Sequence, residues 1–403
     1  APPAGGGVAP STPLRFATRP RSTLEARIAD AVAGILDAAP APAGAAATLD
    51  TDFWQLGLNS LGLTQLALRL EESLGRRVPI SLLLEHRSVA ALARALESGQ
   101  SWNPIVPMNR PRDDGAADAP PQPFACVHPI AGDVSVFLDL ARAMPASLPF
   151  WAIQAPGLEQ GQEPLRSIEE MADANLRALA ERGVPRPRRL GGYSFGGLVA
   201  FEMARRLAGM GAPPERVVLI DTPAPLERVS ILEPDPDHAH AQWLVRMADV
   251  RARFQGVPPV LTRQDLLALP AGERFAFAAA RLHAARLLPP AADADWLARA
   301  HRTSLAQYEA YLAYRPPVQA HPGIALALIR ADAPRDADLG DLENRQLAVP
   351  DMGWQAFSAR PVELRYVAGD HVTMLAGDGA GAVAAAIADL LRAEALACGN
   401  SIA

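Results

Sequence analysis

Ser194 lies in the segment GYSFG (residues 192–196), between an apolar strand-like run and a helical run. The G-x-S-x-G pattern needs its glycines because the chain turns sharply from strand to helix and only small residues fit. The turn exposes the serine oxygen and directs backbone N–H groups, near the positive end of the following helix, at a developing oxyanion. A glycine-rich turn with a capping serine would give the same pattern. The flanking strand and helix favour Ser194 as a nucleophile.

A serine hydroxyl is a weak nucleophile without a general base. The chain has eight histidines, and His371 follows the last strand-like run in a glycine-containing loop. This position agrees with the chain order serine, acid, histidine. His128 ends the first strand-like run, which is more typical of a structural or substrate-contacting residue. We therefore predict His371 as the base.

Two aspartates are candidates for the acid that orients His371. Asp221 directly follows the strand-like run 217–220, and Asp332 follows the run 324–329. The strand before Asp221 is expected beside the nucleophile strand, and Pro223 gives its loop a rigid exit. Asp332 lies in a loop with further aspartates, which is typical of a solvated acidic surface. The sequence favours Asp221.

Backbone N–H groups should stabilise the oxyanion. One is expected from the residue after the nucleophile, Phe195, and the other from the loop after the first strand. That loop is HPIAG, residues 128–132. Since Pro129 has no N–H, Ile130 is the predicted second donor.

A second serine, Ser60, begins a helical pattern elsewhere in the chain. Similar patterns begin near Ser22 and Ser88, with a short turn at residues 81–85. Together they predict a small all-α four-helix bundle over residues 22–97. By residue type alone, Ser60 is a helix N-cap. The apolar face of its helix carries Leu63, Leu66, Leu70 and Leu74.

Two segments lack hydrophobic periodicity and are predicted as linkers, residues 1–21 and 98–123. The chain begins with alanine in a segment rich in alanine, proline and glycine, so we expect a piece of a longer polypeptide.

Residues 124–397 alternate strand-like and helical runs, which predicts a parallel sheet covered by helices on both faces. Between residues 226 and 321 the periodicity is helical, and we predict a helical lid over the carboxyl edge of the sheet. The expected strands are residues 124–127, 150–153, 189–192, 217–220, 324–329 and 362–367.

The composition fits a globular protein, with 49% hydrophobic and 20% charged residues among 403. A net charge of −6 leaves no basic stripe for nucleic acid. No apolar run is long enough for a membrane, no Cys/His cluster has metal-binding spacing, and the glycine motifs lack the P-loop lysine. The two cysteines, Cys126 and Cys398, and the lack of a secretory signal favour a reducing compartment, the cytoplasm.

The segment DFWQLGLNSL, residues 52–61, resembles the phosphopantetheine carrier domains of assembly-line synthases. The resemblance implies that Ser60 bears a covalent 4′-phosphopantetheine arm. The letters GLNS mix the patterns of peptidyl and acyl carriers, so peptide and polyketide cargo both stay open.

Residues 124–395 are similar to the type I thioesterase domains that end nonribosomal peptide and polyketide synthases. The matching segments are VHPIAG (127–132), GYSFGG (192–197), LIDTP (219–223) and GDH (369–371). The resemblance implies an α/β-hydrolase fold and puts the family's acid at Asp221. The order of the two domains is that of a terminal module.

The resemblance implies that an acyl or peptidyl chain moves from its thioester on Ser60 to Ser194 and leaves by hydrolysis or macrocyclisation. The implied partners are upstream synthase domains and a phosphopantetheinyl transferase. Two alternatives remain, a carrier-fused editing or generic serine esterase and a non-catalytic docking module. The complete set of Ser194, Asp221 and His371 argues against the docking module.

Overall fold

The computed structural model describes residues 16–36, 47–58, 60–76, 78, 80–98, 103–109, 122–226, 228, 230–288, 292–333 and 346–399. These residues form two compact units, one before residue 103 and one from residue 103 onward.

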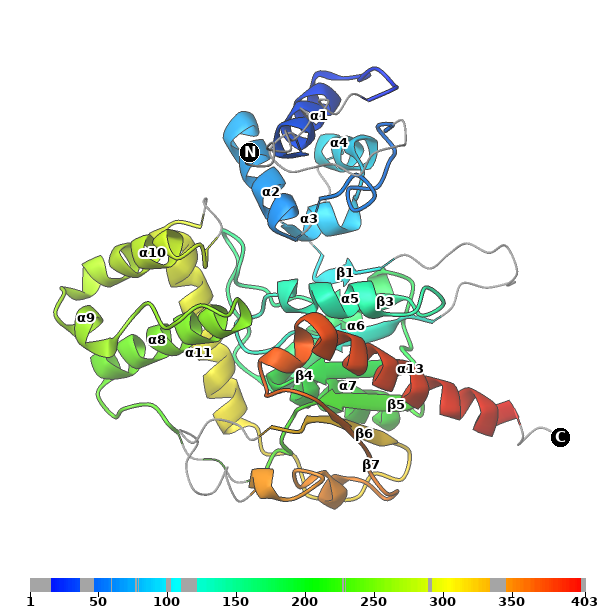
Figure 1. The fold of residues 1–403 in the computed structure, drawn as a ribbon. Helices are drawn as coiled ribbons and strands as arrows, with labels where there is room; N and C mark the ends of the chain where they lie inside the picture. The colour runs from blue at the N-terminus through cyan, green and yellow to red at the C-terminus, as the bar shows by residue number, and fades with distance from the viewer. Residues whose placement is uncertain are drawn as a thin grey trace, which may run out of the picture. The chain divides into compact units, whose positions relative to one another are not determined.

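The first unit is all-helical, as predicted. Four helices make it up in the described ranges: α1 (Thr23–Leu36), α2 (Ser60–Leu74), α3 (Ile80–Glu85) and α4 (Val89–Glu97) (Figure 1). Apolar residues at three- and four-residue spacing, such as Ile28 and Val32 of α1 and Leu66 and Leu70 of α2, are fully buried. Residues 81–85, expected as a turn, belong to helix α3.

Part of the predicted linker 1–21 belongs to this unit, which corrects the prediction. Residues 1–15 lie outside the described residues. The Ala17 N–H donates to the Ala47 carbonyl oxygen at 2.7 Å, and Thr18 Oγ1 accepts from the Leu49 N–H at 3.0 Å. Such isolated backbone pairing leaves no periodic signal in a sequence.

The second unit is built on a seven-stranded sheet within the described ranges, in the order β1-β3-β2-β4-β5-β6-β7. Every neighbouring pair is parallel except β1 and β3. The strands are β1 (Ile105–Pro107), β2 (Phe124–Val127), β3 (Phe150–Ile153), β4 (Arg189–Tyr193), β5 (Arg216–Ile220), β6 (Leu326–Ala331) and β7 (Glu363–Val367).

Strand β1 lies inside the predicted linker 98–123 and corrects that prediction. Ile105 pairs with Ile153 of β3, antiparallel, at the edge of the sheet. A strand of three residues is too short for an alternating pattern, and Pro107 is tolerated because an edge strand need not donate every N–H. Residues 110–121 lie outside the described residues.

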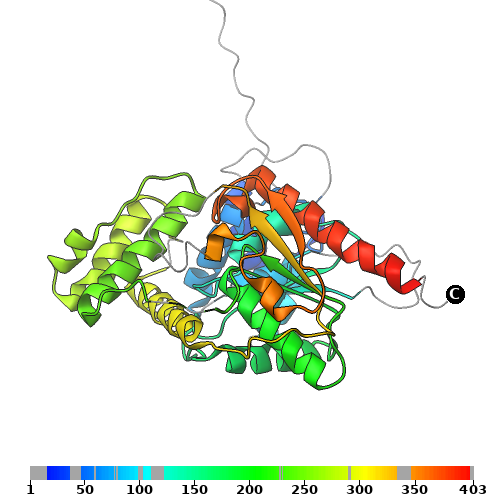
Figure 2. The same cartoon turned by 90° about the horizontal axis from the view of Figure 1, so that it is seen from below.

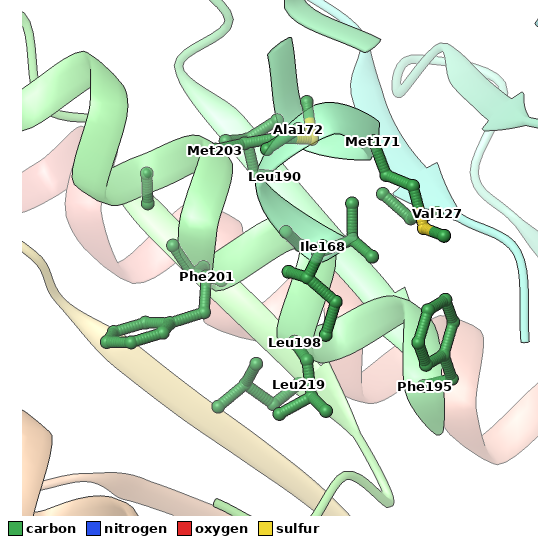
Figure 3. Packing of buried hydrophobic residues seen from close by; sticks show 14 of the residues in the cluster. Val127, Ile168, Met171, Ala172, Leu190, Phe195, Leu198, Phe201, Met203 and Leu219 are labelled. Carbon is green, nitrogen blue, oxygen red and sulfur yellow. The ribbon is translucent and has the colours of Figure 1, made fainter. Parts of the chain in front are cut away.

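Helices cover both faces of the sheet. One layer holds α6 (Ile168–Glu181) and α7 (Phe195–Gly209), and the other holds α5 (Leu138–Ala143), preceded by η1 (Ser135–Phe137), and α13 (Gly377–Gly399). Figure 3 shows Leu198 and Phe201 of α7 close to Ile168 of α6 and Leu219 of β5. Helix α7 begins directly after Ser194.

The described part of the predicted lid, residues 226–321, is helical. It contains α8 (Pro236–Phe254), α9 (Arg263–Leu267), η2 (Ala271–Glu273), α10 (Arg274–Ala284) and α11 (Ala294–Ala313). These helices gather in one group beside the sheet (Figure 2) and share an apolar cluster of their own. Every helix in the described ranges is too short or too polar to cross a membrane.

Candidate active site

The strand-to-helix turn at Ser194 is sterically demanding. Ser194 has φ 55° and ψ −121°, outside the regions that most residues occupy. A Cβ on Gly192 would lie 2.1 Å from the backbone of Gly196, and one on Gly196 would lie 2.3 Å from the Val127 carbonyl oxygen. These close approaches explain why both positions are glycine.

A continuous chain of hydrogen bonds joins the three residues predicted as nucleophile, base and acid. His371 Nε2 lies 3.0 Å from Ser194 Oγ, and His371 Nδ1 lies 2.6 Å from Asp221 Oδ2. A neutral imidazole with its proton on Nδ1 donates to the carboxylate and accepts from the hydroxyl. This arrangement can take the proton from Ser194 and stabilise the imidazolium that forms.

The Asp221 carboxylate is fixed by the strand next to its own. Asp221 follows β5 directly with φ 44°, and its N–H donates to the Ile329 carbonyl oxygen at 2.7 Å. The Ala331 N–H of β6 donates to Asp221 Oδ1 at 3.2 Å. The side chain is 1% exposed, so one oxygen is held while the other faces His371.

Asp332, the other candidate acid, shapes the histidine loop. Its Oδ1 accepts from the Gly369 N–H at 3.0 Å, two residues before His371. The Tyr193 hydroxyl donates to the His371 carbonyl oxygen, and the two rings lie 5.0 Å apart. Sequence reasoning missed Tyr193, although its place beside Ser194 was a signal.

The loop of the predicted donor Ile130 is held through the peptide that precedes it. The Pro129 carbonyl oxygen accepts from His128 Nδ1 at 2.8 Å and from the Gly132 N–H at 3.1 Å. In a planar trans peptide the C=O and N–H point in opposite directions, so these bonds also orient the Ile130 N–H. Burial lowers the pKa of His128 from 6.5 to about 4, so the ring is neutral near pH 7.

Phe195 is the first residue of α7, where backbone N–H groups lack intrahelical acceptors. Within the described ranges, neither the Phe195 N–H nor the Ile130 N–H has a protein acceptor. Both groups can therefore donate to an added oxyanion.

The lid is connected to the histidine loop by an ion pair. Arg253 Nη2 of α8 lies 3.0 Å from Asp370 Oδ2, and the N–H groups of Val372 and Thr373 donate to Asp370 Oδ1. Partial burial raises the pKa of Asp370, but these N–H groups and Arg253 lower it more, and the net pKa lies below its ordinary value. Asp370, the residue before His371, is thus an ionised carboxylate held by Arg253 and two backbone N–H groups.

In the first unit, Ser60 is the first residue of α2. Gly57, with φ 97°, turns the chain that leads to it, and Asn59 lies outside the described residues. A helix N-terminus favours a phosphate because its N–H groups and dipole are positive. The position of Ser60 therefore fits a phosphodiester link. Within the described ranges, no group of three or more His, Cys, Asp or Glu could hold a metal ion.

A mostly parallel sheet with helices on both faces, an elbow serine and a histidine bonded to a buried carboxylate define an α/β-hydrolase. Residues 122–391 match the family model of the thioesterase domain, and residues 26–96 match that of the phosphopantetheine attachment site. Because the first match covers more than half of the chain, the chain belongs to the thioesterase domain family. The second match indicates a covalently attached 4′-phosphopantetheine in the first unit.

Curated relatives are large synthetases. The chain is 33% identical over 163 residues to the nonribosomal peptide synthetase btyA of Aspergillus terreus, covering 40% of this chain and 17% of the relative. It is 32% identical over 180 residues to the atromentin synthetase of Tapinella panuoides, covering 43% and 18%. The chain thus spans less than a fifth of the length of these relatives.

A solved structure is similar in fold. It is a holo four-domain nonribosomal peptide synthetase bound to AMP and glycine, with a TM-score of 0.63 and 24% sequence identity, covering 97% of this chain and 27% of that one.

Proposed function

We propose that this chain releases an acyl or peptidyl chain from a phosphopantetheine thioester on Ser60 by way of an ester on Ser194. The hydrogen-bonded chain Ser194–His371–Asp221 carries the proposal. The family matches on both sides of residue 103 support it, because a carrier and a thioesterase occur in one polypeptide.

The first half of the reaction forms the ester. His371 accepts the proton of Ser194 as Oγ bonds to the thioester carbonyl carbon, and Asp221 stabilises the resulting imidazolium. The N–H groups of Phe195 and Ile130 donate to the oxyanion. His371 then gives its proton to the departing sulfur as the C–S bond breaks.

The second half releases the chain. His371 removes a proton from water, or from a hydroxyl or amine of the acyl chain, which attacks the Ser194 ester. His371 returns the proton to Ser194 Oγ as the ester bond breaks. Water gives a linear acid and an internal nucleophile gives a macrocycle, according to how well the lid excludes water.

The arm supplies a reactive thioester carbonyl on a long tether when it is attached. Ser60 would hold it, with the N-terminus of α2 stabilising the phosphate. We further propose that a phosphopantetheinyl transferase installs the arm, that upstream synthase domains deliver the chain, and that the protein works in the cytoplasm. The names of the synthetase relatives support the upstream domains.

The test is intact mass spectrometry of the full chain after loading with a phosphopantetheinyl transferase and octanoyl-coenzyme A. The wild type should gain the acylated arm and then lose the octanoyl mass. Ser194→Ala should keep the octanoyl mass, and Ser60→Ala should gain nothing. Loss at the same rate in Ser194→Ala would refute the proposed nucleophile.

Two further outcomes would favour the alternatives. Equal rates for octanoyl on Ser60 and on a small thiol, N-acetylcysteamine, would indicate a generic esterase. No reaction of Ser194 with a fluorophosphonate, together with no loss of octanoyl, would indicate a docking module.

A further inference from the structure

A glutamine of the lid bonds to the loop that carries Ile130. Gln307 lies on α11, and its Oε1 accepts from the Ala131 N–H at 2.9 Å across 176 residues of sequence. The side chain is 1% exposed. Ala131 is half-buried, so breaking the bond would leave the buried Gln307 carboxamide oxygen without this partner.

The bond fixes the second of the two peptides around Ile130. Ala131 has φ 94°, a strained value for a residue with a Cβ, which needs support from its surroundings. The peptide before Ile130 is held by His128 and Gly132, as described above. With Gln307 on the following peptide, both peptides that flank Ile130 are hydrogen-bonded, the first within the loop and the second from α11.

The fit around Gln307 is close. A Cβ on Gly132 would lie 2.6 Å from Ala155 Cβ and 3.1 Å from Gln307 Nε2, and Gly132 has φ 81°, so glycine is favoured beside the carboxamide. A carboxamide also adds no charge near the oxyanion, whereas a carboxylate in its place would oppose the negative charge that develops.

We propose that Gln307 is a positioning residue that sets the Ile130 N–H for the oxyanion and makes this donor depend on α11. The proposal rests on the function proposed above. It predicts that loss of the bond weakens the transition state and leaves ground-state binding of the thioester nearly unchanged.

The test compares Gln307→Met with Gln242→Met in the full chain. Methionine keeps the length of the side chain and removes the acceptor. Gln242 of α8 is a matched control because its Oε1 accepts a backbone N–H, that of Glu233, at 3.0 Å inside the lid. The substrate is octanoyl-N-acetylcysteamine, and the inhibitor is an octyl trifluoromethyl ketone, whose adduct with a serine carries the same negative oxygen.

We expect Gln307→Met to lower kcat about 10- to 100-fold with KM within about twofold, and to weaken the ketone by a similar factor. Gln242→Met should leave all three values within about twofold. A kcat near the wild-type value in Gln307→Met, a change in KM alone, or an equal loss in Gln242→Met would overturn the proposal.

An inactive wild type would refute the proposed function instead. In that case amide hydrogen exchange of residues 128–132 decides the inference. Faster exchange at Ala131 in Gln307→Met than in Gln242→Met would support the positioning role of Gln307, and equal exchange would overturn it.

Discussion

The sheet and the lid contribute to the same site by different physical means. Around Ser194, a Cβ on Gly192, Gly196 or Gly197 would lie within 2.1–2.3 Å of a neighbouring atom, so the turn is defined by exclusion. In the lid, Gly256 and Gly272 have no atom within 4 Å of such a Cβ. The lid contacts the site through a hydrogen bond of Gln307, an ion pair of Arg253 and apolar packing of Trp243 and Tyr308 near Ile130. The close contacts at the elbow admit only glycine, whereas a hydrogen bond or an ion pair can be replaced by another side chain. We therefore expect the lid to tolerate substitutions, including those that change specificity, better than the elbow does.

The largest difference between the two regions is expected when a glycine of each is replaced by alanine. In Gly196→Ala the new Cβ would lie 2.3 Å from the Val127 and 2.4 Å from the His128 carbonyl oxygen, and the backbone cannot yield cheaply. We expect a loss of more than about 4 kcal/mol in the free energy of unfolding. Gly272→Ala should stay within about 0.5 kcal/mol. Thermal unfolding of both variants is the measurement, and equal melting temperatures would refute the contrast.

The next effect concerns how each region supports His371. Asp221→Asn keeps the shape of the side chain but favours the wrong imidazole tautomer, so kcat should fall about 10³- to 10⁴-fold. Arg253→Met removes the lid's ion pair with Asp370. Because that pair is partly exposed, we expect a loss of about fivefold or less. Steady-state hydrolysis of the N-acetylcysteamine thioester compares them, and a similar loss in both would mean that the lid supports the base as strongly as the sheet does.

The last comparison is a pH dependence to which one buried histidine from each region contributes. Burial lowers the pKa of His128 and of His301, a residue of lid helix α11, from 6.5 to about 4. Between these values the unfolded chain binds more protons than the folded chain. The contribution of the two neutral histidines to the free energy of unfolding is therefore fully present above pH 6.5. It is lost as the pH drops toward 4, by up to about 3 kcal/mol for each histidine. Urea unfolding at pH 7 and pH 4.5 measures the loss.

His301→Phe separates the two contributions. Phenylalanine keeps a ring near Phe275 and cannot be protonated, so the loss between pH 7 and pH 4.5 should shrink by up to about 3 kcal/mol. His238→Phe, at an exposed position of α8, is the control and should leave the loss unchanged. An unchanged loss in His301→Phe would place the sensitivity outside the lid.

Most strand positions and the residues brought together at the site could be predicted because their signals are local. Chain order and strand ends located Ser194, Asp221 and His371, which the structure joins by hydrogen bonds. The predicted strand 217–220 is Arg216–Ile220 in the structure. An apolar run followed at once by a polar residue is enough to mark the carboxyl edge of a parallel sheet.

Contacts between the lid and the loops at the site could not be predicted. Gln307 and Ala131 are 176 residues apart, and Arg253 and Asp370 are 117 apart. Their pairing depends on how the lid helices lie against the sheet, and a single sequence carries no signal for that. Strand β1 was missed for a different reason, since three residues ending in proline lack an alternating pattern.

Helix α11 is one unbroken rod of 20 residues, about 30 Å long. Leu297, near its start, belongs to the apolar cluster of the lid, and Ala310, near its end, belongs to the core of the sheet. Because the helix is continuous, a displacement of its lid end also displaces the residues between the two clusters. Gln307 is one of these residues. A shift of the lid end of α11 would therefore reach the hydrogen bond on Ala131, which links the position of this helix to the loop that carries Ile130.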